Sequence, residues 1–64
     1  RNEKLRLAIQ DLPEIQRRRF VLYHEFGLTY EQIAKMEGRR KSAVFESVLR
    51  AEEKIREKIK NLKD

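Results

Sequence analysis

Residues 29–45, TYEQIAKMEGRRKSAVF, combine an alanine, a mid-chain glycine and three successive basic residues. Thr29 and Gln32 have the spacing of a capping box, directly before the apolar pair Ile33 and Ala34. Gly38 supplies a residue that adopts the positive φ of a tight turn without steric cost. The stretch therefore predicts a short helix that ends near residue 36, a turn, and another helix that begins near residue 40 or 41.

The apolar residues of this stretch indicate how the two helices meet. When two helices cross steeply over a short turn, their backbones come close, and the crossing point accepts only a small side chain such as that of Ala34. Val44 would close the pocket from the second helix, opposite Ile33. This arrangement is typical of a helix-turn-helix, whose second helix can enter the major groove of DNA.

The charged neighbours of the glycine depart from that pattern. Glu37 and Arg39 stand where a helix-turn-helix usually has an apolar residue on each side of the glycine. We expect them to pair with each other or with neighbouring charges. Exposed pairs contribute only about 0–1 kcal/mol, so they would replace the missing packing only in part.

Two helices are predicted before this stretch. The first covers residues 3–10, because apolar residues recur there at helical spacing. These residues are Leu5, Ala8, Ile9 and Leu12. The second begins at Pro13, which fits the first turn of a helix, and runs to about residue 26. Asp11 and Glu14 would form its capping box, and Gly27 suits the left-handed position past its end.

The second predicted helix has a mixed face. Its inward residues would be Ile15, Phe20, Leu22, Tyr23 and Phe26. Arg17, Arg18 and Arg19 interrupt this face. We expect the arginines either to form a solvated surface whose stems cover the edge of the core, or to contact phosphate groups.

The longest apolar pattern predicts one last helix of roughly six turns. Its inward residues are Val44, Val48, Ala51, Ile55, Ile59 and Leu62. Lys41, Ser42 and Glu46 fall on the opposite face and should point to solvent. The end of this helix would either pack on the first helix or pair with a second copy of the chain. Packing within the domain is favoured, because three apolar layers are marginal for a coiled coil.

Length and composition limit the classes of function. The chain has 64 residues, of which 39% are hydrophobic and 42% charged, and this suits one small all-α domain of four helices without a large cleft. The formal net charge of +5 favours a polyanionic partner. The sequence begins with Arg1 rather than Met, and we expect residues 1–64 to be one domain of a longer chain.

The sequence offers little for catalysis. It contains no cysteine, a single histidine (His24) and no apolar run of membrane length. Neither a metal site nor a nucleophile with its base can be assembled from these residues. We therefore expect no enzyme activity, cofactor, metal, small-molecule substrate or membrane partner, and the absence of cysteine fits a cytoplasmic setting.

From Leu12 to about Ile59 the sequence resembles region 4 of the sigma-70 family of RNA polymerase sigma factors. The resemblance rests on LPE at the start of the second predicted helix, GLTYEQIA leading into the third, and RAEEKI in the last. It implies a bacterial, cytoplasmic domain of four helices that reads a −35 promoter element in double-stranded DNA through its last helix. It also implies docking on the RNA polymerase core, and an anti-sigma or other regulatory protein as a further partner.

The resemblance also implies roles for individual residues. It places base-reading side chains in the first two turns of the last helix, at Lys41, Ser42, Phe45 and Glu46, with Leu49 one turn further on. The candidates for phosphate contact are Arg39, Arg40, Arg50, Arg17 and Arg18. The positions that build the motif itself are Thr29, Ile33, Ala34, Gly38 and Val44. Arg40 replaces a Ser or Thr cap that is common in the family, which leaves the start of the last helix at either Arg40 or Lys41.

The base-reading set is chemically suitable for DNA. Lys41 can donate to guanine, Glu46 can accept from cytosine, and Phe45 can lie against the methyl group of thymine. Ser42 suits either kind of base edge. Acidic residues reduce the basic character of this face.

Helical spacing suggests partners for two of these acidic residues. Glu46 stands four residues before Arg50, and Glu52 stands four before Arg56. This is the favourable order for an ion pair along a helix.

Two alternative functions remain open at this point. A free-standing helix-turn-helix regulator would bind an operator as a dimer through the apolar C-terminal face. A protein-interaction module would instead keep the fold and use the exposed Phe45 and Leu49 to hold another protein.

Overall fold

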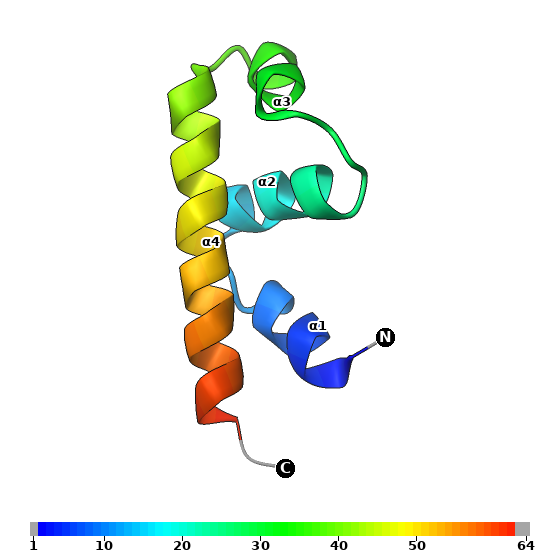
Figure 1. Ribbon diagram of the computed structural model, residues 1–64, viewed down its shortest axis with the longest axis vertical. Helices are drawn as coiled ribbons and strands as arrows, with labels where there is room; N and C mark the ends of the chain where they lie inside the picture. Colours follow the sequence, from blue (N-terminus) through cyan, green and yellow to red (C-terminus); the bar gives the residue numbers. More distant parts are fainter. Residues whose placement is uncertain (1, 63–64) are drawn as a thin grey trace.

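The computed structural model describes residues 2–62. These residues form four α-helices: α1 (Glu3–Gln10), α2 (Glu14–His24), α3 (Tyr30–Glu37) and α4 (Lys41–Asn61). The three short helices lie along one side of α4, which follows the long axis of a molecule measuring 40 × 19 × 15 Å (Figure 1). The all-α fold of four helices predicted from the sequence is confirmed.

Two clusters of buried apolar side chains lie along α4. The first joins α1 and α2 to the C-terminal half of α4 and contains Ala8, Ile9, Leu12, Phe20, Ala51 and Ile55. The second joins α3 to the N-terminal half of α4 and contains Ile33, Ala34, Val44 and Val48. The apolar stripe of α4 thus forms one wall of both clusters. The inward positions predicted for this helix are confirmed from Val44 to Ile55.

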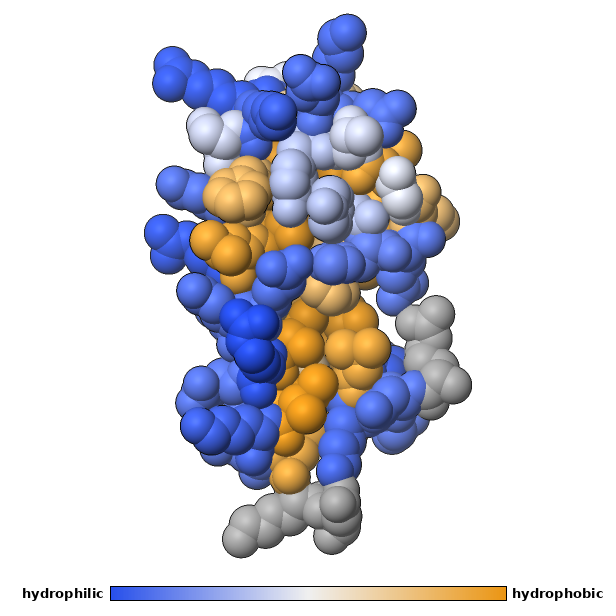
Figure 2. All heavy atoms as spheres, in the orientation of Figure 1, coloured by the Kyte–Doolittle hydropathy of each residue, from blue (hydrophilic) through white to orange (hydrophobic). Residues whose placement is uncertain are grey.

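The C-terminal part of α4 packs on α1 within the domain. Ile55 is buried, and Ile59 is partly buried against the first cluster. An exposed ion pair, with Lys58 Nζ and Asp11 Oδ2 3.0 Å apart, joins the two segments at their surface. Figure 2 shows the apolar strip between α1 and the C-terminal half of α4, with polar side chains on both flanks. Ile55 and Ile59, which were considered for pairing with a second copy, are therefore engaged inside this domain, whereas Leu62 lies just past the end of α4.

The start of α2 differs from the sequence prediction. The helix begins at Glu14, and Pro13 is its N-cap residue, so the capping box expected between Asp11 and Glu14 does not form. Asp11 is itself the C-cap residue of α1. Asp11 and Glu14 have the spacing of a capping box. Asp11, however, still belongs to the end of α1, so it cannot occupy the N-cap position of α2.

Two residues predicted to point inward from α2 are exposed instead. The helix ends at His24, so Phe26 lies in the following turn and is 71% exposed. Ile15 is 51% exposed. Because α2 crosses α4 steeply, α4 covers only the residues near the crossing, and Ile15 lies in the first turn of α2 (Figure 1). Phe20 is buried as expected, whereas Leu22 and Tyr23 are partly buried.

The turn between α3 and α4 depends on one glycine. Gly38 has φ 65° and ψ 37°, the left-handed conformation predicted for it. The Arg39 backbone N–H donates to the carbonyl oxygen of Ala34 over 2.9 Å and closes the end of α3. A Cβ atom built on Gly38 would have no neighbouring atom within 4 Å. Backbone conformation, and not lack of space, therefore selects glycine here.

Replacing Gly38 with alanine should lower the free energy of unfolding by about 1–2 kcal/mol, the cost of holding a residue with a Cβ in the left-handed region. Gly38→Asn should lose less, because asparagine tolerates that region better than alanine. Urea denaturation followed by circular dichroism measures both. Equal losses for the two variants would contradict this explanation.

Candidate nucleic-acid interface

The capping box that starts α3 is present. Thr29 Oγ1 accepts a hydrogen bond from the Gln32 backbone N–H over 3.0 Å, and Gln32 Oε1 accepts one from the Thr29 backbone N–H over 2.9 Å. Both donors belong to the end of a helix, where the backbone has no partner of its own. The sequence prediction for this helix start is confirmed, and α3 continues to Glu37.

The packing between α3 and α4 has the form of a helix-turn-helix. Ile33 and Val44 are completely buried, and Ala34 is 6% exposed. Three residues, 38–40, connect the helices, and α3 runs steeply across the line of α4 (Figure 1). Ile33, Ala34 and Val44 thus form one buried contact between the two helices, with Gly38 in the turn that joins them.

The start of α4 is not capped by a side chain. The helix begins at Lys41, and its N-cap residue Arg40 makes no side-chain cap hydrogen bond. Within residues 2–62, the backbone N–H groups of Lys41 and Ser42 have no hydrogen-bond acceptor. The first turn of α4 therefore presents free donors and the positive end of the helix dipole to solvent.

The side chains predicted to read bases lie on one exposed face of α4. Lys41, Ser42 and Glu46 are exposed, and Phe45 and Leu49 are 45% and 42% exposed. In the described part of the chain, no hydrogen bond or ion pair engages the side chains of Lys41, Ser42 or Glu46. Their polar atoms are therefore available to a partner.

The five candidates for phosphate contact form two groups. Arg39, Arg40 and Arg50 are exposed, and no ion pair engages them within residues 2–62. In contrast, Arg17 Nη1 donates to the carbonyl oxygens of Gln10 and Leu12 over 3.2 and 3.4 Å, which covers the end of α1. Arg18 Nε lies 3.4 Å from Glu37 Oε2, with its side chain 54% exposed.

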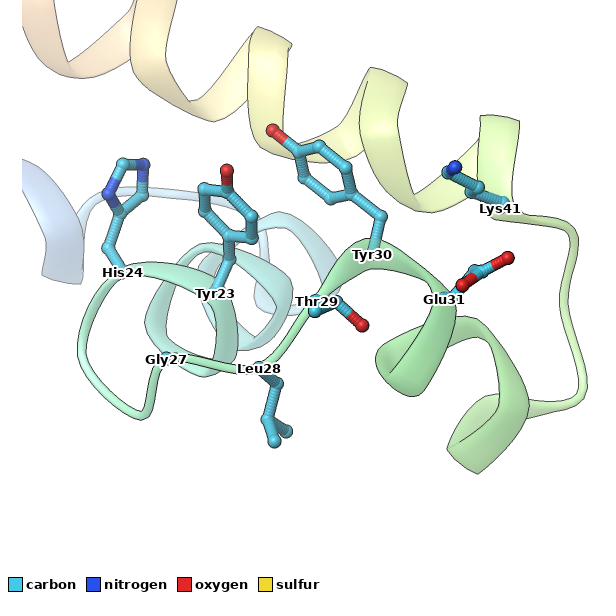
Figure 3. Close-up of a pocket in the computed structure, with 8 residues that line it drawn as sticks. All are labelled: Tyr23, His24, Gly27, Leu28, Thr29, Tyr30, Glu31 and Lys41. Carbon is cyan, nitrogen blue, oxygen red and sulfur yellow. The ribbon is translucent and has the colours of Figure 1, made fainter.

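Two tyrosine rings pack beside Phe45 of the exposed face. Tyr23 and Tyr30 stack with ring centroids 4.3 Å apart, and Phe45 meets Tyr30 edge-on at 5.4 Å. Figure 3 shows both phenol groups beside an open hollow of ≈ 620 Å³, with Lys41 at its far end. A hydrogen bond to Tyr23, then burial and the charge of Glu52, raise the pKa of Tyr30 to about 12. The ring of Tyr30 covers one side of Phe45.

Arg19 is the main feature that sequence reasoning missed. It was expected with Arg17 and Arg18 either on a solvated surface or in contact with phosphate, but it is 7% exposed. Its Nε lies 2.7 Å from Glu37 Oε1, and its Nη1 donates to Ser47 Oγ over 2.7 Å. Glu37 therefore pairs with the arginines of α2 and not with Arg39. A charge in the usually apolar position before Gly38 was the available signal, since it requires a basic partner nearby.

The acidic residues of α4 differ from the helical pairs expected along the sequence. Glu46 makes no ion pair with Arg50, nor Glu52 with Arg56, within the described residues. Glu52 Oε2 instead lies 2.7 Å from His24 Nε2 on α2. The packing of α2 against α4 therefore determines the partner of Glu52, and the spacing of residues along α4 does not.

Residues 2–62 contain no group of three or more His, Cys, Asp and Glu residues that could hold a metal ion. In the same part of the chain, no helix has the length and apolar character needed to cross a membrane.

Comparisons with known proteins identify the family. A family model described as sigma-70, region 4, matches residues 2–55. The match begins ten residues before the resemblance read from the sequence, which started at Leu12, and so includes α1. A search of curated proteins and a search of solved structures each gave no match. This family consists of DNA-binding domains of the transcription machinery and not of enzymes. The chain belongs to the sigma-70 region 4 family.

Proposed function

We propose that residues 1–64 act as one domain that binds promoter DNA in transcription initiation. The first two turns of α4 read a −35 promoter element, while another surface of the domain docks on the RNA polymerase core. A domain with this role works in the bacterial cytoplasm, where promoter and polymerase meet. The observation that carries the proposal is the exposed, unpaired set Lys41, Ser42 and Glu46 at the start of α4.

The chemistry of this face fits a major groove. An α-helix fits that groove, and Lys41 and Glu46 carry the donor and the acceptor that recognise guanine and cytosine edges. The basic residues Arg39, Arg40 and Arg50 are suited to hold phosphates on either side and so fix the register. The free N–H groups in the first turn of α4 are suited to a phosphate as well. Arg17 and Arg18 are weaker candidates, because their guanidinium groups already bond within the protein.

A second surface is suited to the polymerase contact. A groove of ≈ 350 Å³ is lined by α1, α2 and the turn after α2, and none of its lining residues comes from α4. Its apolar residues are Ile9, Val21, Leu22 and Phe26. Arg17, Arg18 and Glu14 line the groove as well, and this excess of basic charge favours an apolar segment that carries acidic residues. A partner bound there would leave the exposed face of α4 free.

One observation favours a second candidate function. Phe45 and Leu49 lie one turn apart and are both about half exposed, as in a protein-binding patch. A protein-interaction module that holds its partner through these residues would bind DNA weakly, with little response to salt. The dimeric regulator has less support, since Ile55 and Ile59 pack against α1 within the domain.

Phosphate binding predicts a steep salt dependence of DNA affinity. Each phosphate contact contributes about 0.9 to the slope of log K against log salt, so Arg39→Ala should reduce the slope by about 1. Arg56→Ala removes another exposed arginine, nearer the other end of α4, and should leave the slope unchanged. Fluorescence anisotropy with a labelled duplex measures both. A flat response of the unaltered chain would favour the protein-interaction module.

Base reading by Lys41 predicts a loss of selectivity. Lys41→Ala should reduce discrimination at one base pair by about 1–3 kcal/mol. The probes are a duplex that the unaltered chain selects from a random pool and single-position variants of it. Lys54→Ala removes an exposed lysine further along α4 and should keep the selectivity intact. Unchanged selectivity in the Lys41 variant would remove this residue from the base-reading set.

The polymerase contact predicts separate effects on two partners. Phe26→Ser should weaken binding of the chain to polymerase core by about tenfold, because a buried aromatic anchor commonly contributes that much or more. DNA binding by the chain alone should not change. Met36→Ser is the control, since Met36 is 64% exposed and does not line the groove. Equal polymerase affinities for the two variants would place the contact elsewhere.

A further inference from the structure

Arg19 is the one charged residue in the described part of the chain that is buried. Burying a charge is costly unless an opposite charge and hydrogen bonds compensate it. The neighbouring Arg17 and Arg18 stay partly exposed or exposed. The burial of Arg19 is thus specific to this position and not a property of the arginine run.

The bonds of Arg19 connect three helices. The residue belongs to α2, its Nε pairs with Glu37 at the last position of α3, and its Nη1 donates to Ser47 in the second turn of α4. Both distances are 2.7 Å, and the Glu37 side chain is only 10% exposed. A guanidinium group is planar and its donors point in fixed directions. It therefore constrains the orientation of its two acceptors as well as their separation.

These two acceptors lie on either side of the helix-turn-helix turn. Glu37 directly precedes Gly38. Ser47 lies three residues after Val44, and it is Val44 that is buried against α3. The apolar contacts of Ile33 and Ala34 with Val44 have no directional preference. The guanidinium group adds a directional constraint between the end of α3 and the body of α4. It does so at the position where the motif usually relies on an apolar side chain.

We propose that Arg19 is a positioning residue for DNA recognition, because its bonds to Glu37 and Ser47 fix the angle at which α3 presents α4. This inference rests on the proposed DNA-binding function. Arg19 itself does not touch DNA. Its removal should therefore change the orientation of α4 and the selectivity for base sequence, beyond any effect on folding.

The test compares three variants of the full chain. Arg19→Met combined with Glu37→Leu removes both charges, and such apolar replacement of a buried ion pair is often neutral or stabilising, so this variant should fold. Ser47→Ala removes only the bond to α4 and keeps the ion pair. Arg56→Met is the matched control, since it removes one exposed arginine of α4 that lies outside the proposed DNA-binding and polymerase surfaces.

Two measurements are made on each variant. Residual dipolar couplings of backbone N–H groups, recorded by NMR without DNA, report the orientation of α3 relative to α4. Anisotropy titrations compare the affinity for a duplex selected by the unaltered chain with that for a scrambled duplex. The Arg19/Glu37 double variant and Ser47→Ala should both show an altered orientation and a preference reduced by about tenfold, equivalent to one lost base contact. Arg56→Met should keep the orientation and a preference within about twofold of the unaltered chain.

Each other result is decisive. A folded double variant with the original orientation would overturn the proposal, whatever its affinity for DNA. An altered orientation with full sequence preference would also overturn it. If the double variant does not fold, Ser47→Ala carries the same two readouts. If the unaltered chain binds no DNA, the proposed function fails, and the NMR measurement still decides whether Arg19 sets the angle.

Discussion

The contact of Ile33 and Ala34 on α3 with Val44 and Val48 on α4 is the constraint on which the rest of the molecule depends. These side chains exclude water almost completely. Once they are buried, the opposite side of α4 must face solvent, because side chains on a helix keep a fixed angular order. Ser42 and Glu46 are exposed for this reason. Lys41 stands three residues before Val44 and is exposed as the first residue of the helix. The small side chain at position 34 and the left-handed turn at Gly38 allow this contact to form within one short connection.

The domain combines this apolar contact with a buried ion pair beside the same turn. Arg19 and Glu37 compensate each other, and the hydrogen bond to Ser47 uses a further donor of the guanidinium group. Apolar packing alone tolerates small rotations of one helix against another, whereas hydrogen bonds to a planar group lose strength when the angle changes. A recognition helix needs its side chains in defined places, so a directional contact near the turn suits the proposed role.

Much of the fold could be predicted from the sequence because it depends on local spacing. The bounds of α1, the capping box at Thr29, the turn at Gly38 and the buried stripe of α4 all follow from residues within a few positions of each other. The face of α4 that is exposed follows from the same stripe. The DNA contacts assigned to that face remain a prediction. The helical period does not depend on which other helix covers the stripe, so these features did not require a knowledge of tertiary structure.

Partners that lie far apart in the sequence were decided only by the tertiary structure. Spacing along α4 paired Glu52 with Arg56, but the crossing of α2 placed His24 Nε2 2.7 Å from Glu52 Oε2. Ile15 and Phe26 are apolar, yet both are exposed, because Ile15 lies in the first turn of α2 and Phe26 lies past its end. Arg19 is buried because Glu37, eighteen residues away, and Ser47 meet it between three helices. The sequence by itself determined the helices and their apolar faces, since backbone geometry sets them. The tertiary structure decided the charge pairs and the edges of the core, because these depend on how the helices cross.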